Sequence, residues 1–124
     1  MVKVLIIDDS EIIRERLSNL LGEIDNVEIV GEAACAAEGL YMVNSYNPDF
    51  IILDISLPDT SGIEVLKVIK KNHPQSCVVM LTNYPYLPYR TQCMAFGADY
   101  FFDKSVEFTR TKKILIDLVC ETYH

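Results

Sequence analysis

Long apolar runs and an excess of basic residues are both missing from this sequence of 124 residues. No run approaches the length of a membrane-spanning helix, and the first residues lead directly into a short strand-like segment instead of a signal peptide. We therefore expect a soluble, cytoplasmic protein with no membrane partner. The 11 Lys and Arg residues are outnumbered by 18 Asp and Glu residues, so the formal net charge is −7. Because this charge repels nucleic-acid phosphates, we expect no direct binding to nucleic acid.

Cysteine is also scarce, and its spacing excludes two common roles. The four cysteines form neither a C-x-x-C pair nor the ligand pattern of a zinc finger, and three of them lie in apolar segments with regular periodicity. The sequence therefore predicts reduced, buried thiols at Cys35, Cys77, Cys93 and Cys120.

Linkers, repeats and low-complexity tracts are absent as well, so we expect one domain over residues 1–124. Segments of helical periodicity alternate with five short apolar segments, at residues 4–7, 27–32, 50–53, 77–81 and 100–102. This alternation predicts an α/β fold of five strand–helix units, (βα)5, with a doubly wound parallel sheet. The more polar second segment is typical of an edge strand. Pro85 and Pro88 predict that the fourth helix begins late and is short.

Polar side chains end four of the predicted strands. Asp8 and Asp9 follow the first strand, Asp54 follows the third, Thr82 the fourth and Lys104 the fifth. In a parallel sheet with right-handed crossovers, these strand ends lie on one edge, where ligands bind. Three carboxylates beside one lysine leave excess negative charge, and their hard oxygen atoms suit Mg²⁺. The pattern brings no imidazole or thiolate nearby that would favour zinc.

The same residues suggest transfer of a phosphoryl group to a carboxylate. Asp54 is the best candidate nucleophile because it ends a central strand and opens a turn-rich loop. Thr82 would donate a hydroxyl hydrogen bond to one phosphoryl oxygen, and the ammonium group of Lys104 would pair with another. We therefore predict that these three side chains carry the chemistry.

The metal ligands are predicted around Asp54. Asp9 would bind Mg²⁺ directly, whereas Asp8 would act through water or by orienting the other ligands. The backbone carbonyl of Ser56, two residues after Asp54, would complete the coordination. The sequence thus predicts an all-oxygen Mg²⁺ site shared by Asp8, Asp9, Asp54 and Ser56.

Four motifs carry a family resemblance over nearly the whole chain. They are LIIDD at residues 5–9, ILDISLPDTSG at 52–62, LT at 81–82 and GADYFFDK at 97–104. Through them the sequence resembles the receiver domain of bacterial two-component response regulators. The resemblance implies the flavodoxin-like strand order 2-1-3-4-5.

The resemblance also implies partners and a switch. Asp54 would take its phosphoryl group from a phosphohistidine on a histidine kinase or a histidine phosphotransfer protein. Thr82 would then move toward the phosphoryl group, and Phe101 would change rotamer and reshape the face made by the fourth helix, fifth strand and fifth helix. This face would signal to a downstream protein target or an output domain. Such a protein catalyses its own phosphorylation and dephosphorylation but is not an enzyme acting on a metabolite.

Two positions depart from the family pattern. The residue after Thr82 is commonly small in receiver domains, but here it is Asn83. The lysine is often followed by a proline in a cis bond, but here Ser105 follows Lys104. A cis bond to a residue other than proline costs about 2.5–4 kcal/mol, so a trans Lys104–Ser105 bond is an alternative.

Three other functions fit parts of the same pattern. Aspartyl phosphatases usually carry a second Asp two residues after the nucleophile, where this chain has Ser56. An FMN binder needs a Ser/Thr/Gly-rich loop after the first strand, where Asp8 and Asp9 would repel the phosphate. A pseudo-receiver that binds partners without phosphorylation is the main alternative, and Asn83 is the residue that favours it.

An aromatic segment before the fourth helix predicts a contact surface. Half-exposed tyrosines give a large contact area at little cost in side-chain entropy. We expect a homodimer or partner surface here, or else packing of the same side chains against the short helix, at Tyr84, Tyr86, Leu87 and Tyr89.

Overall fold

Five parallel strands and five helices alternate along the chain, as predicted. The computed structural model describes residues 1–105 and 108–122. The strands are β1 (Val2–Ile7), β2 (Val27–Ala33), β3 (Phe50–Leu53), β4 (Cys77–Thr82) and β5 (Tyr100–Asp103). The helices are α1 (Glu11–Gly22), α2 (Ala36–Tyr46), α3 (Gly62–Asn72), α4 (Leu87–Ala95) and α5 (Phe108–Thr122). The strand order is β2-β1-β3-β4-β5, which confirms the predicted 2-1-3-4-5 arrangement.

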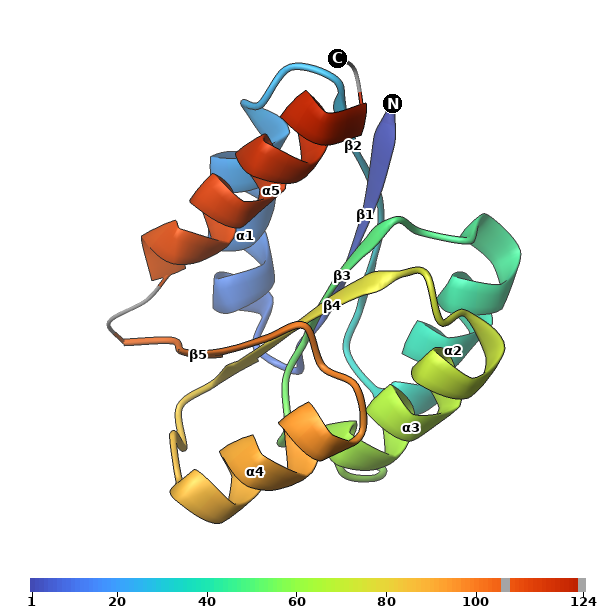
Figure 1. Ribbon diagram of the computed structural model, residues 1–124, viewed down its shortest axis with the longest axis vertical. Coiled ribbons are helices and arrows are strands. Elements are labelled where there is room, and N and C mark those ends of the chain that lie inside the picture. The colour runs from blue at the N-terminus through green and yellow to red at the C-terminus, as the bar shows by residue number, and fades with distance from the viewer. Residues whose placement is uncertain (106–107, 123–124) are drawn as a thin grey trace.

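The sheet lies between two layers of helices. Helices α1 and α5 cover one face, and α2, α3 and α4 cover the other (Figure 1). Alternate strand residues therefore enter two separate apolar cores: Ile6 and Ile52 face α1 and α5, whereas Leu5 and Ile51 face α2 and α3. Because β3 is central, all four of its side chains are buried, and so it reads as a continuous apolar run.

The two edges of the sheet are formed by β2 and β5. Strand β2 has partly exposed and exposed side chains along most of its length, as predicted for an edge strand. Its pairing with β1 shifts register between Val4 and Leu5, an irregularity that is common at sheet edges. The inner strands β1, β3 and β4 pair without a shift, so their carboxyl ends are held in fixed register.

Helix α4 is the short helix that the prolines predicted. It spans nine residues, and Pro88 lies in its first turn, where the missing backbone N–H costs no helical hydrogen bond. Only Cys93 of this helix is buried. Helix α4 is thus attached to the domain by a much smaller apolar face than α3, which buries five residues.

The four cysteines are free, but their burial corrects the prediction. Cys93 is buried, Cys35 and Cys77 are partly buried, and Cys120 is exposed. Cys120 follows Val119, which is buried, and the rotation of about 100° per helical residue turns the next side chain toward solvent. Burial, with a smaller contribution from the charge of Asp99, raises the pKa of Cys77 to about 12.

Among the described residues, no helix is both long enough and apolar enough to span a membrane. The longest helix, α5, has 15 residues and carries charged side chains on its outer side.

Candidate functional site

Four strands of the sheet have their carboxyl ends close together, at one end of the sheet. Asp8 follows β1, Asp54 follows β3, Thr82 ends β4 and Lys104 follows β5. We call these residues, together with Asp9, the strand-end cluster. The register pairs Ile7 with Leu53, so the aspartates that follow these two residues emerge side by side. The backbone N–H of Asp54 also donates to Ile7 O at 2.9 Å.

Three carboxylates of the cluster lie close enough to share one metal ion. Oxygen atoms of Asp8, Asp9 and Asp54 all lie within 4.8 Å of one another. Asp8 and Asp54 are buried, whereas Asp9 is exposed. The donor set is oxygen only, and a hard divalent cation such as Mg²⁺ prefers such ligands. The residues therefore fit the predicted Mg²⁺.

Lys104 is the buried cation of the site. Its Nζ lies 2.6 Å from Asp8 Oδ2 and 3.2 Å from Asp54 Oδ2. Burial lowers the pKa of Lys104, but the hydrogen bond to Asp8 and the charges of Asp54 and Asp8 together outweigh it, so the pKa is raised. The ammonium group is held in its charged form between two carboxylates.

The electrostatics of Asp54 reflect an excess of negative charge. Burial and then the Asp8 carboxylate raise the pKa of Asp54 from 3.8 to about 6, although Lys104 and the Ser56 N–H act in the opposite direction. One lysine thus does not neutralise the buried carboxylates. A divalent cation would supply the missing positive charge.

Asp8 is a site residue and not the cap of the following helix. The N-cap of α1 is Ser10, whose hydroxyl accepts from Ile13 N at 3.3 Å. Asp8 Oδ1 accepts from Ser10 N at 2.9 Å, and the Arg14 guanidinium donates to the Asp8 backbone carbonyl at 2.6 Å. These contacts hold the Asp8 carboxylate in place beside Lys104.

Thr82 lies at the end of β4 and is fully buried. Its hydroxyl oxygen accepts from Tyr84 N at 3.0 Å. In the described part of the chain, no hydrogen bond joins Thr82 to Asp54, so the predicted phosphoryl contact stays a prediction. The next residue, Asn83, is exposed.

Ser56 begins the loop after the nucleophile candidate. Its backbone N–H donates to Asp54 Oδ1 at 3.3 Å, and it forms an antiparallel bridge with Ser61. Gly62 N donates to Ile55 O at 2.7 Å and closes the loop. A Cβ on Gly62 would overlap the backbone carbonyl of Asp54, so this position requires glycine. The loop is therefore tightly folded against Asp54.

Asp59, in the same loop, is a contact that the sequence reasoning missed. Its Oδ1 and Oδ2 accept from Ala36 N at 2.8 Å and Ala37 N at 3.0 Å, at the start of α2. These two hydrogen bonds lower the pKa of Asp59. The residue looked like a simple turn residue because its partners are more than 20 positions away in the sequence, where no local pattern links them.

Phe101 is buried in the core that faces α2, α3 and α4. Arg90 of α4 donates from Nη1 to Phe101 O at 3.3 Å, and its Cζ lies 5.9 Å from the centre of the Phe101 ring. Arg90 is a second contact that the sequence reasoning missed, since a lone arginine on a helix carries no signal of its partner.

The aromatic segment that leads into α4 and forms its first turn is exposed. We call Tyr84, Tyr86, Leu87 and Tyr89 the tyrosine surface; their exposed fractions are 58%, 61%, 69% and 37%. The rings of Tyr86 and Tyr89 contact each other edge to face, with their centres 5.3 Å apart. Packing against the helix therefore covers little of this surface.

No cis peptide bond occurs among the described residues, so Lys104–Ser105 is trans. Ser105 donates to Asp103 Oδ1 from its backbone N at 2.9 Å and from its hydroxyl at 2.7 Å. This turn stands where many receiver domains have proline, and Lys104 still reaches both Asp8 and Asp54.

The family model for the response regulator receiver domain matches residues 4–116. The chain belongs to this family. The receiver domain is 32% identical over 122 residues to response regulator protein VraR of Staphylococcus epidermidis, covering 98% of the chain and 56% of VraR. It is 39% identical over 84 residues to the DNA-binding transcriptional activator DevR/DosR of Mycobacterium tuberculosis, covering 68% of the chain and 39% of that protein.

A solved structure confirms the fold of this receiver domain. The response regulator domain of Thermotoga maritima CheB superposes with a TM-score of 0.84 at 26% identity, covering 98% of the chain and 95% of that domain. The chain spans about half the length of curated relatives that it matches. Receiver domains generally bind Mg²⁺ at an acidic site, and the cluster of Asp8, Asp9 and Asp54 fits that description.

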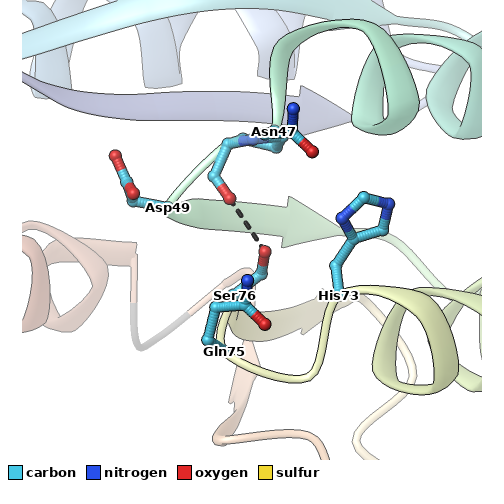
Figure 2. Close-up of a pocket in the computed structure, with 6 residues that line it drawn as sticks. Asn47, Asp49, His73, Gln75 and Ser76 are labelled. Atoms are coloured by element: carbon cyan, nitrogen blue, oxygen red, sulfur yellow. Dashed lines mark hydrogen bonds between the residues drawn. The ribbon is translucent and has the colours of Figure 1, made fainter.

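A pocket of about 120 Å³ lies at the other end of the sheet from the strand-end cluster, where β3 and β4 begin. Figure 2 shows its polar lining, which comes from the segments before these strands. Ser76 Oγ donates to Pro48 O at 2.8 Å across it, and Asp49 Oδ2 accepts from Lys3 N at 2.8 Å. These hydrogen bonds join the loops that enter the sheet, so the pocket is separate from the strand-end cluster.

Proposed function

We propose that this receiver domain is a phosphoacceptor switch that takes a phosphoryl group onto Asp54. The observation that carries the proposal is the contact of Lys104 with both Asp8 and Asp54, 2.6 Å and 3.2 Å away, beside three carboxylates that can share a cation. Asp9 and Asp8 would hold Mg²⁺ with Asp54 and the Ser56 carbonyl. When bound, the ion would offset negative charge on the transferring phosphoryl group.

The reaction balances as a single displacement. A carboxylate oxygen of Asp54 forms a bond to phosphorus while the phosphorus–nitrogen bond of a phosphohistidine breaks, and the imidazole leaves with the electron pair. Lys104 would pair with one phosphoryl oxygen, and Thr82, at the end of β4, would donate to another. Water later attacks the phosphorus, the bond between phosphorus and the Asp54 oxygen breaks, and inorganic phosphate leaves the restored carboxylate. The domain therefore catalyses only its own phosphorylation and dephosphorylation.

The donor and the readout follow from the same proposal. The donor is a histidine kinase or a histidine phosphotransfer protein in the cytoplasm. The readout is a change at Thr82 and Phe101 that alters the face of α4, β5 and α5 and its contact with a target protein, an output domain or a second copy of the chain. The contact of Arg90 with Phe101 supports this coupling, because it joins α4 to β5 at the residue that would move.

Mass spectrometry of the intact chain tests the phosphoacceptor. Incubation with Mg²⁺ and acetyl phosphate should add one phosphoryl group to the wild type and none to Asp54→Asn. Asp49→Asn is the matched control, because Asp49 lies just before the same strand β3 and should leave the modification unchanged. A wild type that stays unmodified would contradict the proposal and favour the pseudo-receiver that Asn83 suggests.

The switch is tested separately by titration with beryllofluoride, an analogue of the phosphoryl group. NMR resonances of Phe101 and of the α4 backbone should shift in the wild type and stay unchanged in Asp54→Asn. If the Phe101 resonances do not move when those of Asp54 do, Phe101 is a core residue without a role in signalling.

A further inference from the structure

The loop after Asp54 is held at its base. Ser56 bonds to the Asp54 side chain and bridges to Ser61, and Gly62 N bonds to Ile55 O. Apart from Ile55 and the half-buried Leu57, the side chains of residues 55–61 are exposed. The apolar core therefore contributes little to ordering the outer part of this loop, and polar contacts must do so.

The outer part is held by Asp59. Its two carboxylate oxygens accept from Ala36 N and Ala37 N, the first two amides of α2. The N-cap residue of that helix, Cys35, makes no side-chain capping bond, so the cap of α2 comes from a different part of the chain. A carboxylate is the favoured group at this position, because free N–H groups and the helix dipole attract negative charge.

We propose that Asp59 is a positioning residue for the Mg²⁺ and phosphoacceptor site. It ties the loop that carries Ser56 to the start of α2. This inference rests on the proposed function, because it assigns Asp59 the task of holding one ligand of the proposed metal site in place. Asp59 is not one of the three carboxylates that can share a cation.

The order of the loop before Mg²⁺ binds affects the affinity for the ion. Ser56 lies between a base held by backbone bonds and a tip held by Asp59. If the tip is released, the loop samples more conformations, and those that offer the Ser56 carbonyl to the ion become a smaller fraction. Binding of the ion must then also order the loop, and this cost in free energy lowers the affinity for the ion. The groups that perform the chemistry, Asp54 and Lys104, stay in place.

The test compares Mg²⁺ binding in Asp59→Ala, Asp59→Asn and the wild type. NMR titration of the 124-residue chain gives the Mg²⁺ midpoint without any phosphodonor. We expect Asp59→Ala to weaken Mg²⁺ binding about five-fold, the lower end of typical coupling between sites. Asp59→Asn keeps one acceptor oxygen and should fall between the two. Hydrogen exchange at the amides of Ala36 and Ala37 should be slowest in the wild type, faster in Asp59→Asn and fastest in Asp59→Ala.

Two controls separate position from charge. Thr60→Ala changes the neighbouring exposed side chain of the same loop, and Asp25→Asn removes one negative charge at an exposed site between α1 and β2. Both should leave the Mg²⁺ midpoint unchanged. With acetyl phosphate, Asp59→Ala should need more Mg²⁺ for half-maximal phosphorylation but reach nearly the wild-type rate at saturation.

The outcomes are distinct. Faster exchange at Ala36 and Ala37 with an unchanged Mg²⁺ midpoint would show that Asp59 only caps α2, and unchanged exchange would also overturn the inference. If Asp59→Ala does not fold, the shift in Asp59→Asn decides. A wild type that binds no Mg²⁺ and takes no phosphoryl group would overturn the proposed function and this inference with it. A wild type that binds Mg²⁺ and takes a phosphoryl group, beside an Asp59→Ala variant with the same Mg²⁺ midpoint, would overturn the inference alone.

Discussion

The strand-end cluster and the tyrosine surface, which begins two residues after Thr82, are built in opposite ways. Asp8, Asp54, Thr82 and Lys104 are each at most 7% exposed and are held by several hydrogen bonds or ion pairs. The tyrosine surface is largely solvent-exposed, and helix α4, which carries Leu87 and Tyr89 of this surface, buries only Cys93. A dense site resists displacement, whereas a loosely attached helix can shift at low cost. Under the proposed function, the cluster would take the phosphoryl group and α4 would be the element that moves.

The largest expected effect comes from removing the buried cation. Lys104→Met should lower the free energy of unfolding by about 3–5 kcal/mol without divalent ions, because the buried carboxylates of Asp8 and Asp54 lose their only described counter-charge. Urea denaturation at neutral pH measures this change. Lys71→Met, at an exposed position in the last turn of α3, should change it by less than about 0.5 kcal/mol. Equal stability of the two variants would show that the cluster is more solvated than its burial indicates.

A smaller loss is expected where the backbone of the site is crowded. Gly62→Ala should destabilise the domain by about 2–3 kcal/mol, because the added Cβ overlaps the Asp54 carbonyl. Gly22→Ala is the matched control, since a Cβ there meets no atom within 4 Å. Thermal unfolding of both variants decides whether the loop after Asp54 is as rigid as its hydrogen bonds suggest. Wild-type stability in Gly62→Ala would contradict it.

The raised pKa of Asp54 predicts a pH effect of similar or smaller size. Between pH 3.8 and about 6 the folded chain binds more protons at Asp54 than the unfolded chain does, so its contribution to stability falls as the pH rises through this window. The unfolding free energy of the wild type minus that of Asp54→Asn should fall by roughly 2 kcal/mol as the pH rises through this window. Each pKa unit corresponds to about 1.4 kcal/mol, and solvent screening reduces the total.

Urea denaturation of both proteins from pH 4 to pH 7, with a chelator present, measures this difference. Using the difference removes the effect of other carboxyls such as Asp59 and Asp103, whose pKa values are lowered and whose effect has the opposite sign. If this difference is the same from pH 4 to pH 7, the pKa of Asp54 is not raised in the folded chain.

The smallest effect is expected on the tyrosine surface. Leu87→Ala should change the unfolding free energy by less than about 0.5 kcal/mol, because the side chain is 69% exposed. Leu81→Ala, in the buried part of β4, should cost about 2–5 kcal/mol. If this surface joins two copies, sedimentation should show a dimer of the phosphorylated wild type that Leu87→Ala weakens. A monomer under all conditions would contradict the dimer.

Much of the fold could be predicted because its signals are local. The central strand β3 and the short helix α4 each follow from nearby residues alone, from a continuous apolar run and from Pro85 and Pro88. The strand-end cluster was also predictable, since the ends of parallel strands must share one edge. The sequence pattern placed Cys120 in the core wrongly, because one position of error around a helix exchanges a buried face for an exposed one.

The contacts of Asp59 and Arg90 could not be predicted in the same way. Asp59 completes a helix that starts 23 residues earlier, and Arg90 reaches a strand from the side of α4. Neither partner leaves a periodic or compositional trace near these residues. Such contacts depend on the distances between elements after they have packed.

The amino-acid sequence by itself determined the alternating strands and helices, the polar residues that end them, and so the place of Asp54 among Asp8, Asp9, Thr82 and Lys104. Only the tertiary structure decided how these groups are balanced: one ammonium shared by two buried carboxylates, a raised pKa at Asp54, and a loop tied to α2 by Asp59. The physical reason is that periodicity and strand ends are local properties, whereas burial and charge balance arise from all elements together.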